Sequence, residues 1–205
     1  MSSTRSARFL RGIPAATRAA LAAAVLAVAG CGGGGDASAP GAMAPAISDG
    51  GAAAPAASFP TCNLADFRAG LLARVNQARA RGTTCGSEGA FAPVAAVAWN
   101  DALTQAASGH AADMAAHNYF SHTSQDGRTL SQRVDETGYR WSVLGENIAA
   151  GQRTVNSVVD AWLASPGHCA NIMRPEFTEM GVACVPGPAG NDFGTYWAME
   201  LARPR

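Results

Sequence analysis

A segment that reads as a strand with two apolar faces constrains this fold most strongly. Residues 180–185 are MGVACV, so both sets of alternating positions are apolar. Residues 186–192 are rich in turn formers, and residues 195–201 (TYWAMEL) return to a strand period. This pattern predicts a β-hairpin. Because both faces of its first strand must be covered, we expect helices on each side of the sheet.

Four segments with apolar residues at helical spacing supply these outer layers. They cover residues 64–81, 101–115, 129–137 and 154–164. Asn63 is the expected N-cap of the first helix, Asn100 caps the second, and Pro166 ends the fourth. The sequence therefore predicts an α+β fold, a three-layer α-β-α sandwich with a small antiparallel sheet between the helices.

The first 30 residues have the pattern of a secretory signal peptide. Four Arg and no acid precede an apolar run from Ala19 to Ala29, which is too short to cross a hydrocarbon core of about 30 Å as a helix. The run ends in VAGC at residues 28–31, which resembles the lipobox of bacterial lipoproteins. This resemblance implies lipidation of Cys31, and Gly32 after it implies the outer membrane. The alternative is ordinary cleavage after Ala29, which gives a periplasmic or extracellular protein.

Residues 31–60 are expected to form a flexible tether, and residues 61–205 the folded domain. Gly, Ala, Pro and Ser dominate the tether, so it has too little apolar surface to offset the entropy of ordering. Without the signal peptide, 11 Arg and no Lys stand against 15 acids, a net charge of −4. Such a surface cannot neutralise a run of phosphates, which argues against nucleic acid as a partner.

The domain contains four cysteines, namely Cys62, Cys85, Cys169 and Cys184. An even number in an exported domain, with no CxxC pair, favours two disulfides over a metal cluster. Of three possible connectivities, we predict Cys62–Cys85 and Cys169–Cys184, because each pair encloses one local unit. Each closed loop should contribute roughly 3 kcal/mol on the chain-entropy model.

Several polar motifs lie beside turn residues at the ends of apolar elements, where a scaffold presents a site. They are FSH (120–122), GENIA (145–149), SPGHCANIM (165–173), FTEMGVAC (177–184) and YWAME (196–200). In these motifs and their order, the chain resembles the CAP superfamily of cysteine-rich secretory, pathogenesis-related and venom allergen proteins. It is most similar to the bacterial SCP-like extracellular members. The resemblance implies an α-β-α sandwich, the fold class that the hydrophobic pattern predicts independently.

The resemblance also implies a cleft lined by two His and two acids, which in some members binds a divalent metal such as zinc. His122, Glu146 and His168 match three of these positions, and Ser165 stands at about the position of the second acid. Two imidazoles and a carboxylate can hold Zn²⁺ with water in a fourth position. We therefore expect the three residues to converge in one accessible cleft, with zinc or another divalent metal as the candidate cofactor.

The same residues also have structural interpretations. His122 and His168 could simply hydrogen-bond loops around the cleft, and Glu146 could accept backbone N–H groups between strands. His110 lies on the apolar face of the second helix and is expected to be a packing residue. A serine triad of Ser165, Glu146 and His168 is disfavoured, because no nucleophile-elbow or oxyanion signature accompanies it.

Two classes of function remain. The first is an exported, lipid-anchored binding module whose cleft takes a lipid, glycan or peptide ligand. The second is a metal-dependent hydrolase that uses the same cleft, with Glu146 as ligand or general base. The resemblance favours binding over catalysis, and so does the missing second acid.

Overall fold

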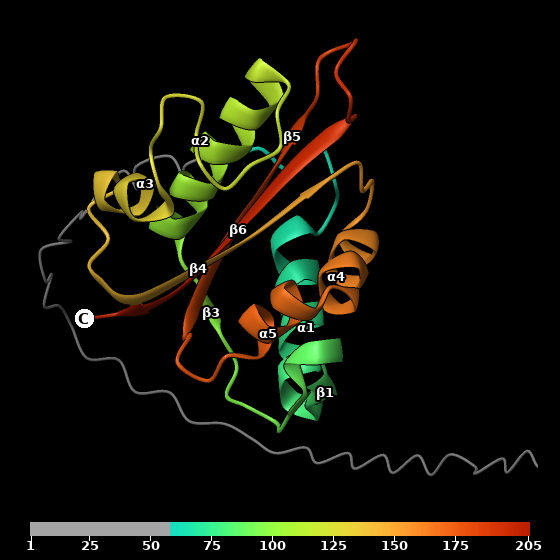
Figure 1. Cartoon of the computed structure of the whole chain (residues 1–205), viewed down its shortest axis with the longest axis vertical. Helices are drawn as coiled ribbons and strands as arrows, with labels where there is room; N and C mark the ends of the chain where they lie inside the picture. The colour runs from blue at the N-terminus through green and yellow to red at the C-terminus, as the bar shows by residue number, and fades with distance from the viewer. Residues whose placement is uncertain (1–57) are drawn as a thin grey trace, which may run out of the picture. The chain divides into compact units, whose positions relative to one another are not determined.

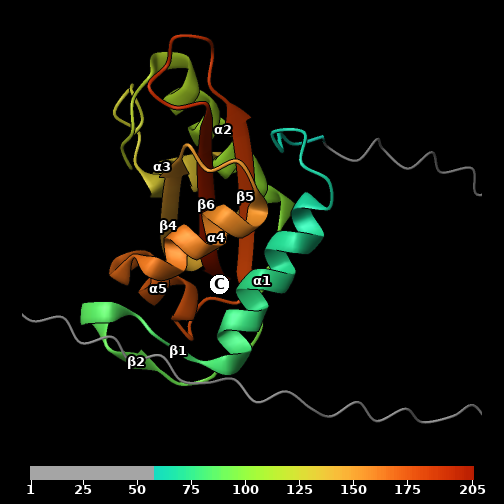
Figure 2. The same ribbon diagram turned by 90° about the vertical axis from the view of Figure 1, so that its right-hand side faces the viewer.

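A four-stranded sheet lies between two layers of helices in residues 58–205, the part of the chain that this computed structural model describes (Figure 2). Its strands are β3 (Ala98–Trp99), β4 (Trp141–Ala150), β5 (Glu179–Pro186) and β6 (Thr195–Pro204). The helices are α1 (Phe67–Arg81), α2 (Asp101–His117), α3 (Leu130–Glu136), α4 (Val155–Ala164) and α5 (Pro166–Met173). Helices α2 and α3 cover one face of the sheet, and α1, α4 and α5 cover the other (Figures 1 and 2). The predicted three-layer α+β sandwich is therefore confirmed.

Part of the sequence prediction concerns residues outside this range. The predicted signal peptide (1–30), the predicted lipidation site Cys31 and the predicted tether up to residue 57 all lie outside the described residues. Within residues 58–205, no helix is both long enough and apolar enough to cross a membrane.

Strands β5 and β6 form the predicted hairpin, with Cys184 opposite Trp197 in antiparallel register. Residues 180–184 are all buried, as expected for a strand with helices on both sides. The sheet is mixed rather than antiparallel, because β3 pairs in parallel with β5. The chain passes through α2, α3 and β4 before it reaches β5, and long crossovers of this kind allow neighbouring strands to run parallel.

Strand β4 was not predicted, although it carries the GENIA motif. It pairs antiparallel with β6 at the edge of the sheet, in the order β3-β5-β6-β4. Four successive residues, 146–149, are buried, while the start of the strand is partly exposed. The strand therefore lacks the regular alternation by which a half-buried strand is recognised in a sequence.

Local capping explains where most helices begin. The Asn100 side chain accepts hydrogen bonds from the N–H groups of Ala102 and Leu103, as predicted. Helix α1 begins later than expected, after Asp66 rather than after Asn63. The preceding residues are held against β5, where the Cys62 N–H donates to the Cys184 carbonyl at 3.1 Å.

Helix α5 was also missed, because Pro166 was interpreted as the end of α4. Pro166 instead occupies the first position of α5. Proline is well tolerated there, since the N–H that it lacks has no partner within the helix. The SPGH motif therefore joins two helices, and His168 lies in the first turn of the second.

The predicted disulfide pairing is wrong. The structure joins Cys62 to Cys184 and Cys85 to Cys169, across sequence separations of 122 and 84 residues. The first bridge ties the segment before α1 to β5, and the second ties the loop after β1 (Thr83–Thr84) to α5. Loops of this length correspond to about 4.5–5 kcal/mol each on the chain-entropy model, more than the local pairing offers.

Small residues allow α2 to lie close to the sheet. Ala107 and Ala111 of α2 pack with Ala183 and Ala198 of the hairpin. At Gly181, a Cβ atom would lie 2.2 Å from the backbone nitrogen of Thr104, so a side chain would force the helix away. The buried face of α2 also carries His110, whose Nε2 lies 3.8 Å from Oε2 of Glu146 on β4.

A buried arginine fastens α1 to the far end of α5. Arg79 is fully buried, and its guanidinium donates four hydrogen bonds to backbone carbonyls. The acceptors are Ala95 at 2.7 Å, Ile172 at 2.6 Å, Arg174 at 3.0 Å and Phe177 at 2.9 Å. Helix α5, which carries His168 in its first turn, is thus held at its C-terminal end by hydrogen bonds from the Arg79 guanidinium to backbone carbonyls.

Candidate functional site

The GEN motif places Gly145, Glu146 and Asn147 on β4, where each makes different contacts. Gly145 leaves room for Phe177, whose Cζ atom would lie 2.6 Å from a Cβ at this position. Asn147 binds α5 through its Nδ2, which donates to the His168 carbonyl at 3.0 Å. Since successive strand residues face opposite sides, Glu146 points to the α2 and α3 side. The motif therefore packs α5 with one face and builds a polar centre with the other.

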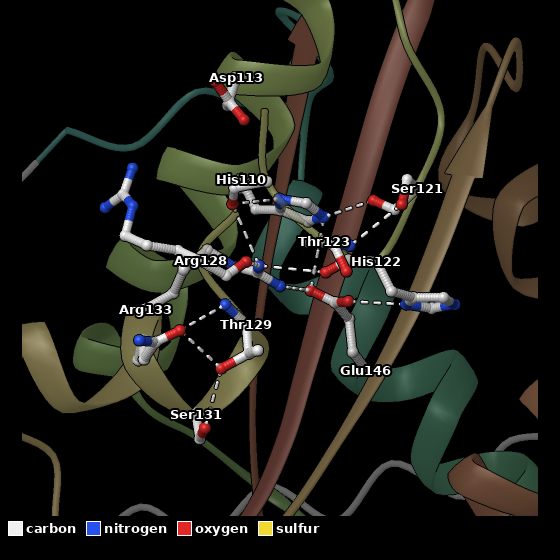
Figure 3. A network of polar contacts seen from close by, with 12 residues as sticks. His110, Asp113, Ser121, His122, Thr123, Arg128, Thr129, Ser131, Arg133 and Glu146 are labelled. Atoms are coloured by element: carbon white, nitrogen blue, oxygen red, sulfur yellow. Dashed lines mark hydrogen bonds and ion pairs between the residues drawn. The ribbon is translucent and has the colours of Figure 1, made fainter. Parts of the chain in front are cut away.

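The Glu146 carboxylate is the centre of a network of charged side chains (Figure 3). His122 Nδ1 lies 2.7 Å from Oε1, and Arg133 Nη2 donates to Oε2 at 2.5 Å. His110 Nε2 is 3.8 Å from Oε2. Burial alone would raise the pKa of Glu146, but the hydrogen bond from His122 and the charges of His110 and Arg133 lower it. The carboxylate is therefore held ionised.

Arg133 of α3 joins this carboxylate to the loop that carries the FSH motif. Its side chain is only 3% exposed. Its Nη1 donates at 3.1 Å to the His122 carbonyl, to the Ser124 hydroxyl and to the Arg128 carbonyl. One guanidinium thus holds both the Glu146 carboxylate and the backbone of His122 in place. Sequence reasoning missed Arg133. The only feature that could have pointed to it is its place next to Val134, which is buried in the same short helix.

His110 is a packing residue, as expected, but it also belongs to this network. Its ring is fully buried, and Nε2 lies 2.9 Å from the Ser121 carbonyl, to which it can donate. Burial lowers the pKa of His110, although the charge of Glu146 opposes this effect. A ring that donates through Nε2 braces the loop directly before His122.

His122 itself faces solvent, with its side chain 57% exposed. Because Glu146 engages Nδ1, the other ring nitrogen, Nε2, is left for an external partner. The sequence-based expectation that His122 and Glu146 meet is therefore met in the geometry. The pair presents an oriented imidazole at the surface, above a buried carboxylate.

Ser165 and His168 line a groove of about 290 Å³ beside this pair. Its other walls are Phe120, residues 148–150 and Gln152 from β4 and the loop after it, Ala161 and Trp162 from α4, and Phe193 from the hairpin turn. Burial lowers the pKa of His168, and the charge of His122 lowers it further, so the two rings lie within electrostatic range. A larger hollow of about 430 Å³ lies at the opposite end of β4, around Arg140 and Trp141, away from these residues.

The residues present do not fit the metal site that the family resemblance implies. Within residues 58–205, no group of three or more His, Cys, Asp or Glu side chains is arranged to hold a metal ion. Both oxygens of Glu146 are already engaged, one by His122 and one by Arg133. The described residues therefore do not arrange His122, Glu146 and His168 as a three-ligand metal site.

A second acid does accompany Glu146, but it comes from β6 and not from the region of Ser165. Glu200 lies directly opposite Glu146 in the strand register. It is fully buried, and neither of its carboxyl oxygens has a hydrogen-bond partner among the described residues. Burial, and then the charge of Glu146, raises the pKa of Glu200 well above its usual range. The sequence signal was a glutamate within the otherwise apolar strand segment YWAMELA.

Comparison with known proteins adds a family match. Residues 72–201 match the model of CAP, described as the cysteine-rich secretory protein family. The uncharacterized protein YkwD of Bacillus subtilis (strain 168) is 35% identical over 102 residues, 50% of this chain and 37% of that protein. The uncharacterized membrane protein YlbC of the same organism is 34% identical over 89 residues, 43% of this chain and 26% of that protein. The matched region thus spans less than two fifths of either relative.

Two solved structures are also similar. One is an extracellular protein containing an SCP domain from Bacillus anthracis str. Ames, with 31% identity and a TM-score of 0.47, covering 54% of this chain and 34% of that chain. The other is an outer surface protein from Borrelia burgdorferi, with 21% identity and a TM-score of 0.49, covering 55% of this chain and 80% of that chain.

Proposed function

Because this chain belongs to the CAP family of cysteine-rich secretory proteins, we propose that it is an exported binding module. Its ligand would occupy the groove beside His122 and Glu146. The observation that carries the proposal is the state of the Glu146 carboxylate, one oxygen of which contacts His122 while the other accepts from Arg133. This leaves the free nitrogen of His122 and the polar groove residues for an external molecule.

The same geometry favours binding over hydrolysis. A carboxylate whose pKa is lowered and which is bound to a guanidinium is a poor general base. An oriented imidazole next to an open groove suits recognition, in which a few placed polar groups fix the orientation of a ligand.

The proposal places the domain outside the cytoplasm. Two disulfides are typical of exported proteins, and the family is secretory by description. We further propose that lipidation of Cys31 anchors the protein to the outer membrane through the tether. Mass spectrometry of the mature protein tests this anchor: a lipidated Cys31 is expected at the amino terminus, and an unmodified terminus at Gly30 would refute it.

The binding function is tested by NMR titration of the purified exported protein. The probes are lauric acid, N,N′,N″-triacetylchitotriose and the tripeptide Ala-Phe-Ala. At least one should shift the resonances of His122 and His168, and His168→Ala should abolish that response. His117→Ala is the matched control, because His117 is an exposed histidine on α2 outside the groove. If no probe shifts groove resonances, the proposed function fails.

A further inference from the structure

Two exposed aromatic rings form one end of the groove. Phe120 and Phe193 are 47% and 37% exposed, and they are the exposed large hydrophobic residues of the described chain. Phe120 follows α2 and Phe193 lies in the turn between β5 and β6, yet their ring centroids are 6.0 Å apart, with a 54° angle between the planes. Paired exposed phenyl rings at a groove are typical of a binding surface, since their exposure costs stability without a ligand.

The polar residues of the groove lack partners within the described residues. The side chains of Gln152, Ser165 and His168 line the groove, and none forms a hydrogen bond with another described residue. Gln152 Oε1 is also shielded from solvent, so it is a buried acceptor without a donor. Leaving such a group unpaired costs about 1–3 kcal/mol.

The groove carries no formal charge from acids or arginines. Its walls contain no Asp, Glu or Arg, so an anionic headgroup or an acidic sugar would find no counter-charge inside it. A plain acyl chain would satisfy the phenyl rings but would leave Gln152, Ser165 and His168 unpaired. A peptide strand would have to pair with the edge of β4, where two carbonyls are already occupied. The Ile148 carbonyl accepts from Trp162 Nε1 at 3.1 Å, and the Glu146 carbonyl accepts from Asn171 Nδ2 at 3.2 Å.

A neutral sugar ring has the required chemistry on its two sides. The C–H face of a pyranose is apolar and packs on phenyl rings, while its hydroxyl edge both donates and accepts hydrogen bonds. The amide of Gln152, the hydroxyl of Ser165 and the imidazole of His168 can each donate or accept. The groove volume of about 290 Å³ suits a small rigid unit better than a long flexible chain.

We propose that this groove binds an uncharged sugar unit of a glycan, packed on Phe120 and Phe193 and hydrogen-bonded to Gln152, Ser165 and His168. This assignment rests on the binding function proposed above and names its ligand class. The apolar rings contribute contact area, and the polar side chains of Ser165 and His168 set the orientation of the ring. Sugars that carry a charge on the contacting ring should bind more weakly than neutral ones.

The experiment measures sugar affinity of the purified exported protein by NMR titration with N,N′,N″-triacetylchitotriose and with maltotriose. We expect saturable shifts at Gln152, Ser165 and His168 with at least one of the two sugars. Phe193→Leu keeps an apolar side chain but removes the ring, and Gln152→Ala removes the amide side chain from the groove wall. Each should weaken binding about tenfold, the equivalent of 1.4 kcal/mol. The control His117→Ala should bind as the wild type does, and far-ultraviolet circular dichroism should show that every variant is folded.

The outcomes separate this inference from the proposed function. If lauric acid or Ala-Phe-Ala binds the groove and neither sugar does, the glycan assignment is overturned while the binding function stands. If none of the four probes binds, both proposals fail. If a sugar binds but Phe193→Leu and Gln152→Ala bind equally well, the sugar lies elsewhere and the assignment to this groove is wrong.

Discussion

Replacing Glu200 by Gln should stabilise the protein at neutral pH, and the gain should grow as the pH rises. Both carboxyl oxygens of Glu200 are buried without a hydrogen-bond partner among the described residues. Burial, followed by the charge of the cross-strand residue Glu146, raises the pKa of Glu200 well above its usual range. The folded protein therefore keeps a proton on this side chain at pH values where the unfolded chain has released it.

The size of the effect follows from proton linkage. A glutamate in the unfolded chain ionises at about pH 4.3. Between that value and the raised pKa of the folded state, the folded protein holds one more proton, so the free energy of unfolding falls by about 1.4 kcal/mol per pH unit. The stabilising contribution is complete below the unfolded pKa and is lost as the pH rises through the folded pKa. Gln resembles a protonated Glu in shape but does not titrate, so the variant lacks this slope.

Urea unfolding at pH 4, 5, 6 and 7 tests the prediction. Wild type and Glu200→Gln should be similar at pH 4, and above pH 5 the variant should gain about 1.4 kcal/mol per pH unit over the wild type until the pH reaches the raised pKa of the folded state. Glu88→Gln, at an exposed position, is the control and should follow the wild-type pH dependence. A difference between Glu200→Gln and wild type that is the same at every pH would refute the reasoning.

Three further predictions concern the supports of the site. Arg79→Leu should lower the free energy of unfolding by about 3–5 kcal/mol, because four backbone carbonyls lose their donor. In urea unfolding, Arg79→Lys should cost less, and Arg81→Leu, at an exposed position, should cost little. Equal losses for Arg79→Leu and Arg81→Leu would contradict a stabilising role of the Arg79 hydrogen bonds. Glu146→Gln should destabilise the protein by about 3–5 kcal/mol, because Arg133 loses its buried counter-charge; differential scanning calorimetry should show a lower Tm, and an unchanged Tm would exclude a structural role for this pair. Non-reducing peptide mapping should link Cys62 to Cys184 and Cys85 to Cys169; any peptide that joins Cys62 to Cys85 would contradict the fold at α1.

The sequence alone determined the features that depend on neighbouring residues. Asn100 accepts from the first N–H groups of its own helix, and Thr154 caps α4 in the same way, so both helix starts follow from residues within three positions. The hairpin follows from the strand period of residues 180–185 and 195–201 and from the turn between them. The two apolar faces of β5 then required helices on both sides, which yielded the three-layer class.

The tertiary structure decided what depends on contacts between distant segments. Local loop closure favoured Cys62–Cys85, yet the chain before α1 lies along β5 and brings Cys62 to Cys184 instead. Sequence motifs pointed to His122, Glu146 and His168, but not to Arg133, which occupies the carboxylate, nor to Glu200, which lies opposite it on the neighbouring strand. Hydrophobic periodicity describes which side of an element is buried. It does not describe which charged group from another element will meet a buried carboxylate, because that depends on the packing of all layers at once.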